Sequence, residues 1–344
     1  MKILFVITHG NAGGAQRHVA SAANGMSGRG HQVSVLVGEG DWLRNRLSSS
    51  VDVIEAKMLR RSWNPAHTLG FMKELFNLVE KNGYELVHFH SSNALLGVFG
   101  MPRKVKKIAT VHGYSLMSKG WSGSILKKLV YSFVMQLSLR GMNEIIFVCK
   151  ADQDAWKGKH SQLIYNGIST DQPFMERSQA RAELGFTEND FVIGTIARAS
   201  YAKHLDLFYE IASSVPAAKF INLSGRHEHP KVYLKALDGF VLTSRFEGFP
   251  YALLEAAVAR VPMISSDVGG VSELLDQNAG VLVSPGDKAA FVRAIQDLLS
   301  RPDKARERSS NAINKVEHKF SESEMLDKLE HVYASHETGR LGDR

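Results

Sequence analysis

The chain alternates between short apolar runs and segments in which apolar residues recur at helical spacing. The first run, KILFVIT, ends at the polar loop HGNAGG. Similar runs follow at 31–39, 85–90, 107–112 and 144–149. Helical spacing occupies the intervening segments, among them 68–81 and 124–140. This alternation is typical of a doubly wound parallel sheet, which binds ligands at the carboxyl ends of its strands.

A polar stretch at 163–190 interrupts this rhythm, and a second series of the same kind follows it. Its apolar runs lie at 191–197, 219–224, 239–244, 261–266 and 279–284. From Asp287 to about residue 336 the pattern is helical and charged, and the last residues look loose. We therefore expect an α/β fold of two Rossmann-like domains, 1–168 and 169–320. Residues 321–344 would form a helix and tail that pack back on the first domain.

Length and composition agree with this division. At roughly 150 residues per domain, 344 residues suggest two domains, and 44% hydrophobic with 22% charged residues suits globular ones. Cys149 is the single cysteine, which excludes an internal disulfide and fits a reducing, cytoplasmic location. The apolar start reads as a buried strand, and an uninterrupted apolar run of about 20 residues is absent.

The positive charge is concentrated in the first half. Residues 1–170 contain 21 Lys and Arg against 10 Asp and Glu, a net charge of +11, whereas the remainder carries −4. Such a surface attracts phosphate-bearing ligands, anionic lipid or nucleic acid, or serves solubility alone. Because the aromatic and basic motifs of known nucleic-acid modules are missing, we expect no nucleic-acid partner.

The stretch EGFPYALLE places two carboxylates, Glu247 and Glu255, around an apolar turn. Pro250 suits the start of a helix, so Glu247 would lie in the preceding loop and Glu255 in the second helical turn. Both carboxylates can then face the free N–H groups of that helix end, where phosphate binds well. The alternative is that Glu247 only complements the helix dipole and Glu255 is a solvated surface acid.

Other polar groups would end at the same edge of the second sheet. Arg198 and Lys203 follow its first strand, and Gly269 and Gly270 open a further loop. Two cations beside a helix end can neutralise a diphosphate, and carboxylates accept hydrogen bonds from sugar hydroxyls. The pattern favours a ligand that carries both a diphosphate and sugar hydroxyls.

Together these segments resemble the retaining glycosyltransferases of the GT-B fold, in particular the large fourth family, which uses nucleotide-sugar donors. The resemblance is carried by GGAQRHV, TVHG, IYNGI, the Arg198 and Lys203 segment, SRFEGFPYALLEAAVARVPMISSDVGG and GVLVSPGD. It implies two domains facing across a cleft, the second binding the donor and the first the acceptor. It also implies metal-independent transfer without a cofactor, because cations and helix dipoles stabilise the leaving diphosphate.

The resemblance assigns roles to individual residues. Glu247 would contact the donor sugar, Glu255 the nucleotide ribose, and Arg198 with Lys203 the diphosphate. The remaining expected donor contacts are Gly13, Gly14, Gly248, Phe249 and Pro250. The catalytic set would be His112, Glu247, Arg198 and Lys203, with His112 near the reacting sugar. Transfer would retain the anomeric configuration through a same-face displacement.

Two features depart from the family pattern. Gln16 stands where many relatives have Glu, which implies a slightly altered acceptor or donor contact. Only KFINLSGRHEHPKVYLKALDGF separates the Lys203 helix from the strand before Glu247, so we expect one β-α unit, on the order of 30 residues, to be absent. That unit normally helps to line the base pocket, where Arg226 and His227 would lie instead.

The histidines of HFH and TVHG have more than one interpretation. His88 and His90 lie on one face of a strand, and with His112 they form a set that can bind zinc. We expect instead no metal, an acceptor contact for His90, and a polar strand end for His88.

Residues 102–140 combine basic residues with Trp, Tyr, Phe and Met. Such a segment suits an anionic membrane surface, although a core helix with a solvated end explains it equally well. A membrane-peripheral position on the inner face of the cell membrane would suit a polyprenyl-diphosphate-linked acceptor.

The sequence thus favours a hexosyl- or N-acetylhexosaminyl-transferase. We expect it to move a sugar from a nucleoside-diphosphate sugar, with UDP favoured, to a saccharide or lipid-linked saccharide in bacterial surface polysaccharide synthesis, lipopolysaccharide included. Two alternatives stay open. One is a sugar-nucleotide epimerase on the same fold, and the other is a degenerate GT-B protein that binds sugar or nucleotide with little turnover.

Overall fold

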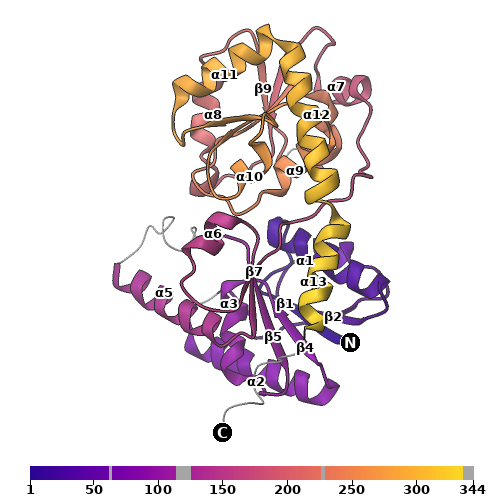
Figure 1. Ribbon diagram of the computed structural model, residues 1–344, viewed down its shortest axis with the longest axis vertical. Coiled ribbons are helices and arrows are strands. Elements are labelled where there is room, and N and C mark those ends of the chain that lie inside the picture. The colour runs from indigo at the N-terminus through magenta and orange to yellow at the C-terminus, as the bar shows by residue number, and fades with distance from the viewer. Residues whose placement is uncertain (62–63, 114–124, 226–228, 336–344) are drawn as a thin grey trace.

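The computed structural model describes residues 1–61, 64–113, 125–225 and 229–335, and for residues 126–128 it describes the backbone alone. Within these residues the chain forms two parallel sheets, which lie in the lower and upper halves of Figure 1. The carboxyl ends of both sets of strands face the region where the halves meet.

The first sheet has seven strands in the described residues, in the order β3-β2-β1-β4-β5-β6-β7. Their bounds are β1 Lys2–Ile7, β2 Gln32–Val37, β3 Asp52–Glu55, β4 Leu86–Phe89, β5 Lys106–Val111, β6 Glu144–Phe147 and β7 Ser161–Leu163. All neighbouring pairs are parallel, as the alternation of apolar runs with helical segments predicts.

Helices cover both faces of this sheet because successive strand side chains point to opposite faces. Phe5 lies in the core beneath α1 (Gly14–Gly28) and α13 (Glu322–Ala334). Val6 lies in the core beneath α2 (Pro65–Asn82) and α5 (Ile125–Arg140). The other elements of this half are η1 Arg44–Arg46, α3 Ser92–Leu95, η2 Leu96–Gly100 and α6 Lys150–Ala155.

The second sheet has five strands in the described residues, in the order β12-β11-β10-β8-β9. The strands are β8 Val192–Thr195, β9 Lys219–Asn222, β10 Gly239–Leu242, β11 Met263–Ser266 and β12 Val281–Val283. The helices of this half are α7 Arg177–Leu184, η3 Tyr201–Lys203, α8 Leu205–Ala212, η4 Pro230–Ala236, α9 Tyr251–Val258, α10 Val271–Leu275, α11 Lys288–Ser300 and α12 Pro302–Lys319. The prediction of two doubly wound α/β domains is therefore confirmed, while the missing β-α unit stays a prediction from the sequence.

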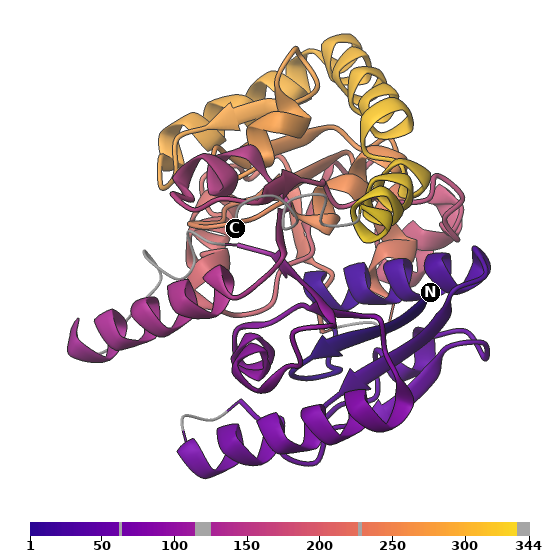
Figure 2. The ribbon, with the colours of Figure 1, turned by 60° about the horizontal axis from the view of Figure 1, so that its bottom comes forward.

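The chain passes between the two halves twice. Ile168 pairs with Ser321 where these passages lie side by side, next to the predicted boundaries after residues 168 and 320. The helical region predicted after Asp287 is broken into α11, α12 and α13, and Ser321 begins the last helix by accepting a hydrogen bond from Glu324 N at 3.2 Å. α12 packs on α9 and α13 packs on α1, so the C-terminal helix covers the first sheet (Figures 1 and 2).

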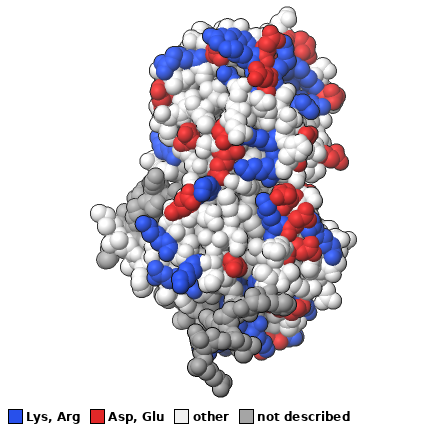
Figure 3. Space-filling model, in the orientation of Figure 1, with Lys and Arg blue, Asp and Glu red and all other residues white. Residues whose placement is uncertain are grey.

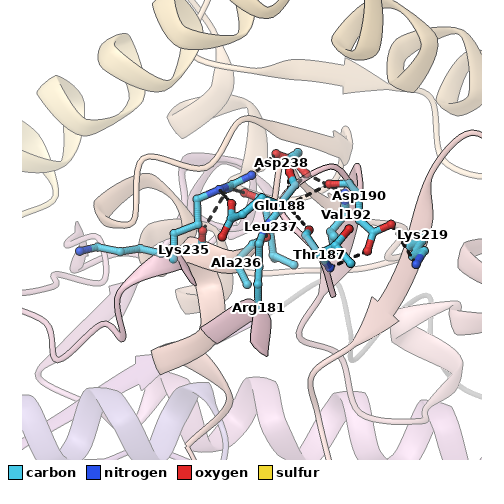
Figure 4. Close-up of polar contacts among 11 residues, drawn as sticks. Arg181, Thr187, Glu188, Asp190, Val192, Lys219, Lys235, Ala236, Leu237 and Asp238 are labelled. Carbon is cyan, nitrogen blue, oxygen red and sulfur yellow. Dashed lines mark hydrogen bonds and ion pairs between the residues drawn. The ribbon is translucent and has the colours of Figure 1, made fainter. Parts of the chain in front are cut away.

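The polar stretch predicted as a link contains a helix, α7, with a buried arginine. Arg181 is 1% exposed, and its guanidinium donates to the carbonyls of Ala236, Thr187, Glu188 and Asp190 at 2.8–3.1 Å and to the Asp238 carboxylate at 2.7 Å (Figure 4). All three nitrogen atoms of the guanidinium thus donate hydrogen bonds, as burial of a charged group requires. This network fastens α7 to β8 and β10.

No described helix is long and apolar enough to span a membrane.

Candidate functional site

A cleft of about 810 Å³ lies between the carboxyl ends of the two sheets. This volume is within the usual range for a small-molecule site. The predicted site residues that line it are Gly13, Gly14, His112, Arg198, Lys203, Glu247, Gly248, Phe249, Pro250 and Glu255. The structure therefore brings most of the predicted site residues together in one cleft.

Glu247 lies in the loop between β10 and α9, close to a cation of the same domain. The residue is 7% exposed, and its carboxylate accepts hydrogen bonds from Lys203 Nζ at 2.5 Å and from Ser244 Oγ at 2.6 Å. Lys203 reaches this position because η3 follows β8, the strand next to β10 in the sheet. A ligand phosphate at Lys203 would thus lie beside the Glu247 carboxylate.

Glu255 lies in the second turn of α9 and faces the opposite domain. Its side chain is 1% exposed and forms an ion pair with Arg17 of α1, which is itself 25% exposed. Burial of a carboxylate is tolerated where a guanidinium compensates its charge. The two domains therefore share a charged pair within the cleft.

The start of α9 supplies an anion site beside these side chains. Pro250 precedes the first helical residue, Tyr251, and has no N–H group to leave unpaired. Among the described residues no acceptor is found for the backbone N–H groups of Gly248 and Phe249. Free N–H groups at a helix N-terminus attract anions.

The Gly13–Gly14 loop at the start of α1 closes the cleft from the first domain. A Cβ atom on Gly13 would lie 3.7 Å from Arg198 Nη2, and one on Gly14 would lie 3.9 Å from the Tyr251 ring. A side chain at Gly13 would also meet Gln16, whose Oε1 lies 2.5 Å from the Cβ position, so the glycine lets the loop backbone come close to the exposed Arg198 guanidinium at the edge of the cleft.

Glycines also let the two domains touch at the floor of the cleft. A Cβ atom on Gly248 would lie 2.2 Å from the His112 carbonyl oxygen, and one on Gly270 would lie 2.6 Å from Cys149 Cβ. Two hydrogen bonds hold the same junction: Lys150 N donates to Glu273 Oε1 at 2.8 Å, and Asn166 Nδ2 donates to Phe249 O at 2.6 Å. The loop that carries Glu247 is thereby fixed against the first domain.

Four histidines, His18, His88, His90 and His112, cluster beneath the first-domain side of the cleft, with ring centroids 4.0–5.6 Å apart. Burial lowers the pKa of His18 to about 4 and lowers the pKa of the other three well below the usual value. The rings are therefore neutral near pH 7. Despite the zinc alternative, no group of three or more His, Cys, Asp or Glu residues in the described part of the chain is arranged to hold a metal ion.

Two polar atoms at the cleft wall lack a hydrogen-bond partner among the described residues. They are Nδ1 of His112 and the hydroxyl of Tyr251, and both are buried. Burial raises the pKa of Tyr251, so its hydroxyl keeps its proton and can donate. Buried polar groups are ordinarily paired, so these two atoms suit the polar groups of a bound ligand.

The remaining predicted site residues lie elsewhere. Gln16 and His90 are buried beneath the cleft and are not among its lining residues. The Gln16 amide donates to the His9 carbonyl at 2.9 Å, and His90 Nδ1 lies 3.3 Å from His112 Nε2. Arg226 and His227 lie outside the described residues.

The cleft is also lined by residues that the sequence did not predict as site residues, among them Arg17, Asn166 and Lys231. Arg17 lies one turn into the helix that follows the glycine pair, a position that could have signalled a cleft contact. Asn166 lies inside the IYNGI motif, and its Oδ1 accepts from His18 Nδ1 at 3.0 Å while its Nδ2 binds the second domain. No sequence pattern indicates that Lys231 lines the cleft, because its position depends on the conformation of the loop after β9.

Residues 12–172 match the family described as Glycosyltransferase Family 4, and residues 218–315 match the family described as Glycosyl transferases group 1. The sequence is similar to UDP-Gal:alpha-D-GlcNAc-diphosphoundecaprenol alpha-1,3-galactosyltransferase of Escherichia coli. The two are 26% identical over an alignment that covers 88% of each chain.

Solved structures show the same fold. Sucrose-phosphate synthase of Thermosynechococcus elongatus matches with a TM-score of 0.85 and 19% identity, covering 97% of this chain and 98% of the other. Anabaena HepE in complex with UDP-glucose matches with a TM-score of 0.78 and 20% identity, covering 98% of this chain and 100% of the other. The two sheets and their connecting passages are those of the GT-B fold.

Proposed function

Because the chain belongs to the GT-B glycosyltransferases of the family-4 type, we propose that it transfers a sugar from a UDP-sugar to a saccharide or lipid-linked saccharide. The transfer would serve bacterial surface polysaccharide synthesis. The observation that carries the proposal is the convergence of Glu247, Glu255 and Lys203 on one cleft opposite the Gly13–Gly14 loop.

The second domain binds the donor. The diphosphate lies between Arg198, Lys203 and the free N–H groups at the start of α9, where positive charge surrounds it from three sides. The donor sugar contacts Glu247, and the ribose hydroxyls donate to Glu255. Arg17 also contacts Glu255. The ribose therefore either binds this carboxylate together with the Arg17 guanidinium or displaces the guanidinium from it.

The first domain presents the acceptor. The His112 side chain offers its unpaired Nδ1 to the ligand, and as a neutral imidazole it acts through hydrogen bonding. The acceptor hydroxyl forms a bond to the anomeric carbon as the bond from that carbon to the diphosphate oxygen breaks. The hydroxyl proton passes to the leaving diphosphate on the same face, so the anomeric configuration is retained.

No metal enters this scheme. The negative charge that develops on the leaving diphosphate is met by Arg198, Lys203 and the α9 dipole, which are preorganised before the reaction begins. The described carboxylates and histidines of the cleft do not form a metal-binding set, and we propose metal-independent transfer.

The relative from Escherichia coli supports the choice of substrates. Its name specifies UDP-galactose as donor and a GlcNAc linked to diphosphoundecaprenol as acceptor. HepE was solved with UDP-glucose bound. We therefore propose a UDP-hexose or UDP-N-acetylhexosamine donor and an acceptor saccharide carried on a polyprenyl diphosphate.

Release of UDP tests the proposal. Purified protein is incubated with UDP-galactose, UDP-glucose, UDP-N-acetylglucosamine or GDP-mannose, with and without a GlcNAc-diphospholipid. The proposal expects UDP release from one UDP-sugar only when acceptor is present, and Glu247→Gln should reduce it. Conversion of the sugar nucleotide without acceptor would support an epimerase, and binding without any turnover would support the degenerate alternative.

A further inference from the structure

Several residues that line the cleft have no part in the proposed contacts with diphosphate, sugar and ribose. They are Trp42 and Arg46 of the first domain and Gln172, His229 and Lys231 of the second. Glu255, Arg17 and Arg46 are all near enough to Lys231 to affect its pKa, which burial lowers overall. These residues therefore lie beside the carboxylate proposed to bind the ribose, where the base of a nucleotide would be.

Arg46 joins the two domains at this end of the cleft. Its Nη2 lies 3.0 Å from His229 Nδ1, and η4, which begins directly after His229, carries Lys231. Its Cζ lies over the Trp42 ring, 3.9 Å from the centroid, and its Nη1 donates to the Trp42 carbonyl at 3.3 Å. Figure 3 shows basic and acidic side chains together along the line where the two halves of the molecule meet. The planar donor group of Arg46 is thus held in place between the domains.

The polar side chains at this end of the cleft are mainly hydrogen-bond donors. Arg46 and Lys231 have donors alone. Because a guanidinium cannot accept, His229 Nδ1 must accept the hydrogen bond from Arg46, and the neutral ring then carries its proton on Nε2 as a further donor. The Gln172 amide is engaged through both atoms, since Oε1 accepts from Lys231 at 2.7 Å and Nε2 donates to the Ser169 carbonyl at 2.9 Å. A ligand that binds here should therefore offer acceptors.

The nucleotide bases differ in what they present to such donors. Uracil O4 and guanine O6 are acceptors, whereas cytosine N4 and adenine N6 carry amino groups, which are donors. Donors that face an amino group leave polar groups unpaired on both sides, and this is costly once water is excluded. Uracil and cytosine have the same size and shape, so a preference between them depends on hydrogen bonding at this one position.

We propose that Arg46 of the first domain, together with His229 and Lys231 of the second, binds the carbonyl edge of the base and selects uridine over cytidine nucleotides. This inference rests on the proposed function, because it takes the nucleotide ribose to lie at Glu255. It assigns part of base recognition to the domain opposite the one that holds the diphosphate, so the base is recognised only in the closed cleft. The cations of this end would also attract a phosphate, and the experiment below distinguishes the two ligands.

Nucleotide binding without any acceptor tests the proposal. Calorimetric titration compares UDP with CDP, and we expect the native chain to bind UDP about tenfold or more tightly. Arg46→Met should weaken UDP binding about tenfold and CDP binding less, because only uracil loses a hydrogen bond at O4. Arg44→Met is the matched control, since Arg44 lies on the same short helix, η1, but pairs with Glu55 at 3.7 Å and is not among the lining residues of the cleft.

Inorganic diphosphate separates recognition of the base from other effects of Arg46. It should bind the native chain and Arg46→Met alike. An equal loss for diphosphate and UDP would show that Arg46 acts on the phosphates or on closure of the cleft, and would overturn the proposal. Equal affinity of the native chain for UDP and CDP would overturn it as well. Lys231→Met is a second variant that should reduce the preference for UDP, and a native preference in both variants would contradict the assignment.

The same variants separate this inference from the proposed function. A preference for UDP that depends on Arg46, in a chain that transfers no sugar from any UDP-sugar, would sustain the base site and overturn the transferase. Transfer from a UDP-sugar by a chain whose preference for UDP over CDP is unchanged in Arg46→Met and Lys231→Met would sustain the transferase and overturn the base site.

Discussion

Arg17 of α1 and Glu255 of α9 form an ion pair across the cleft, although they lie 238 residues apart in the sequence. The carboxylate is almost fully buried, and the guanidinium reaches it from the opposite domain. The pair joins the helix behind the Gly13–Gly14 loop to the helix that begins at the proposed diphosphate site. Ligand binding and domain contact are therefore expected to depend on the same carboxylate.

The first prediction concerns the ribose. Glu255→Gln should weaken UDP binding by about 10- to 100-fold, since a hydrogen bond to a charged group is worth about 1.5–3 kcal/mol. Inorganic diphosphate, which lacks ribose, should bind the variant and the native chain alike. Calorimetric titration measures both affinities, with Glu210→Gln on the exposed side of α8 as control. An equal loss for both ligands would remove Glu255 from the ribose site.

The second prediction concerns the diphosphate. Lys203→Ala should weaken UDP and inorganic diphosphate together by about tenfold or more, because a charge-assisted contact to the shared group is lost. The variant should also slow transfer. Lys219→Ala is the control, since Lys219 pairs with Asp190 at 2.9 Å at the opposite end of the sheet. Native affinity for inorganic diphosphate in Lys203→Ala would contradict the assignment.

The third prediction concerns the contact between the domains. Gly248→Ala places a methyl group where the His112 carbonyl lies, at 2.2 Å, and both partners are backbone atoms that cannot rotate away. We expect the domains to move apart, the radius of gyration to rise and transfer to fall sharply, with each domain still folded. Small-angle scattering with a transfer assay checks this. Gly28→Ala is the control, because its Cβ would meet nothing within 4 Å.

The fourth prediction concerns pH. The folded chain depresses the pKa of His18 from 6.5 to about 4, so the unfolded chain binds a proton first as the pH falls. Stability contributed by neutral His18 is complete above pH 6.5 and is lost as the pH falls towards 4, at about 1.4 kcal/mol per pH unit. His88, His90 and His112 act in the same direction.

Thermal unfolding between pH 7 and pH 5 measures this effect. The native chain should lose stability over that interval, and His18→Gln should lose less, because one titrating group is gone. A stability that stays level from pH 7 to pH 5 would show that the cluster is not neutral in the folded chain.

The fifth prediction concerns the buried arginine. Arg181→Met should lower the free energy of unfolding by about 3–5 kcal/mol, because Asp238 and four carbonyls lose the group that satisfies them. Arg177→Met should cost much less, since Arg177 is 41% exposed and shares Asp238 with Arg181. Denaturant titration compares the two. Equal losses would indicate that burial of Arg181 is not what stabilises this junction.

The sequence predicts the sheets well because the apolar residues of each buried strand can be recognised without knowledge of the rest of the fold. KILFVIT and HQVSVLVGE are apolar where both faces of the sheet are covered, and this signal needs no distant partner. The same holds for the loop before α9, where Glu247, Pro250 and Glu255 are fixed by a local turn. The lining of the cleft by these residues followed from the rule that ligands meet the carboxyl ends of parallel strands.

Contacts between distant segments cannot be predicted from local sequence patterns. The place of Arg17 after the glycine pair indicates a cleft contact, but its partner Glu255 belongs to the other domain and has no sequence signal. Arg181 looked like part of a polar link, because its five acceptors come from turns that have no sequence signature. The sequence predicts Gln16 as a cleft residue, yet its amide donates to the His9 carbonyl beneath the cleft, an orientation set by side-chain packing.

Proton NMR of the complete reaction distinguishes retaining transfer from a UDP-sugar from inverting transfer and from hydrolysis. The anomeric proton of the transferred sugar is observed as the native chain acts on its UDP-sugar and acceptor. Retaining transfer predicts an α-linked product, the same configuration as in the donor, formed together with an equal amount of UDP. A β-linked product, or free sugar released to water with no transfer, would contradict it.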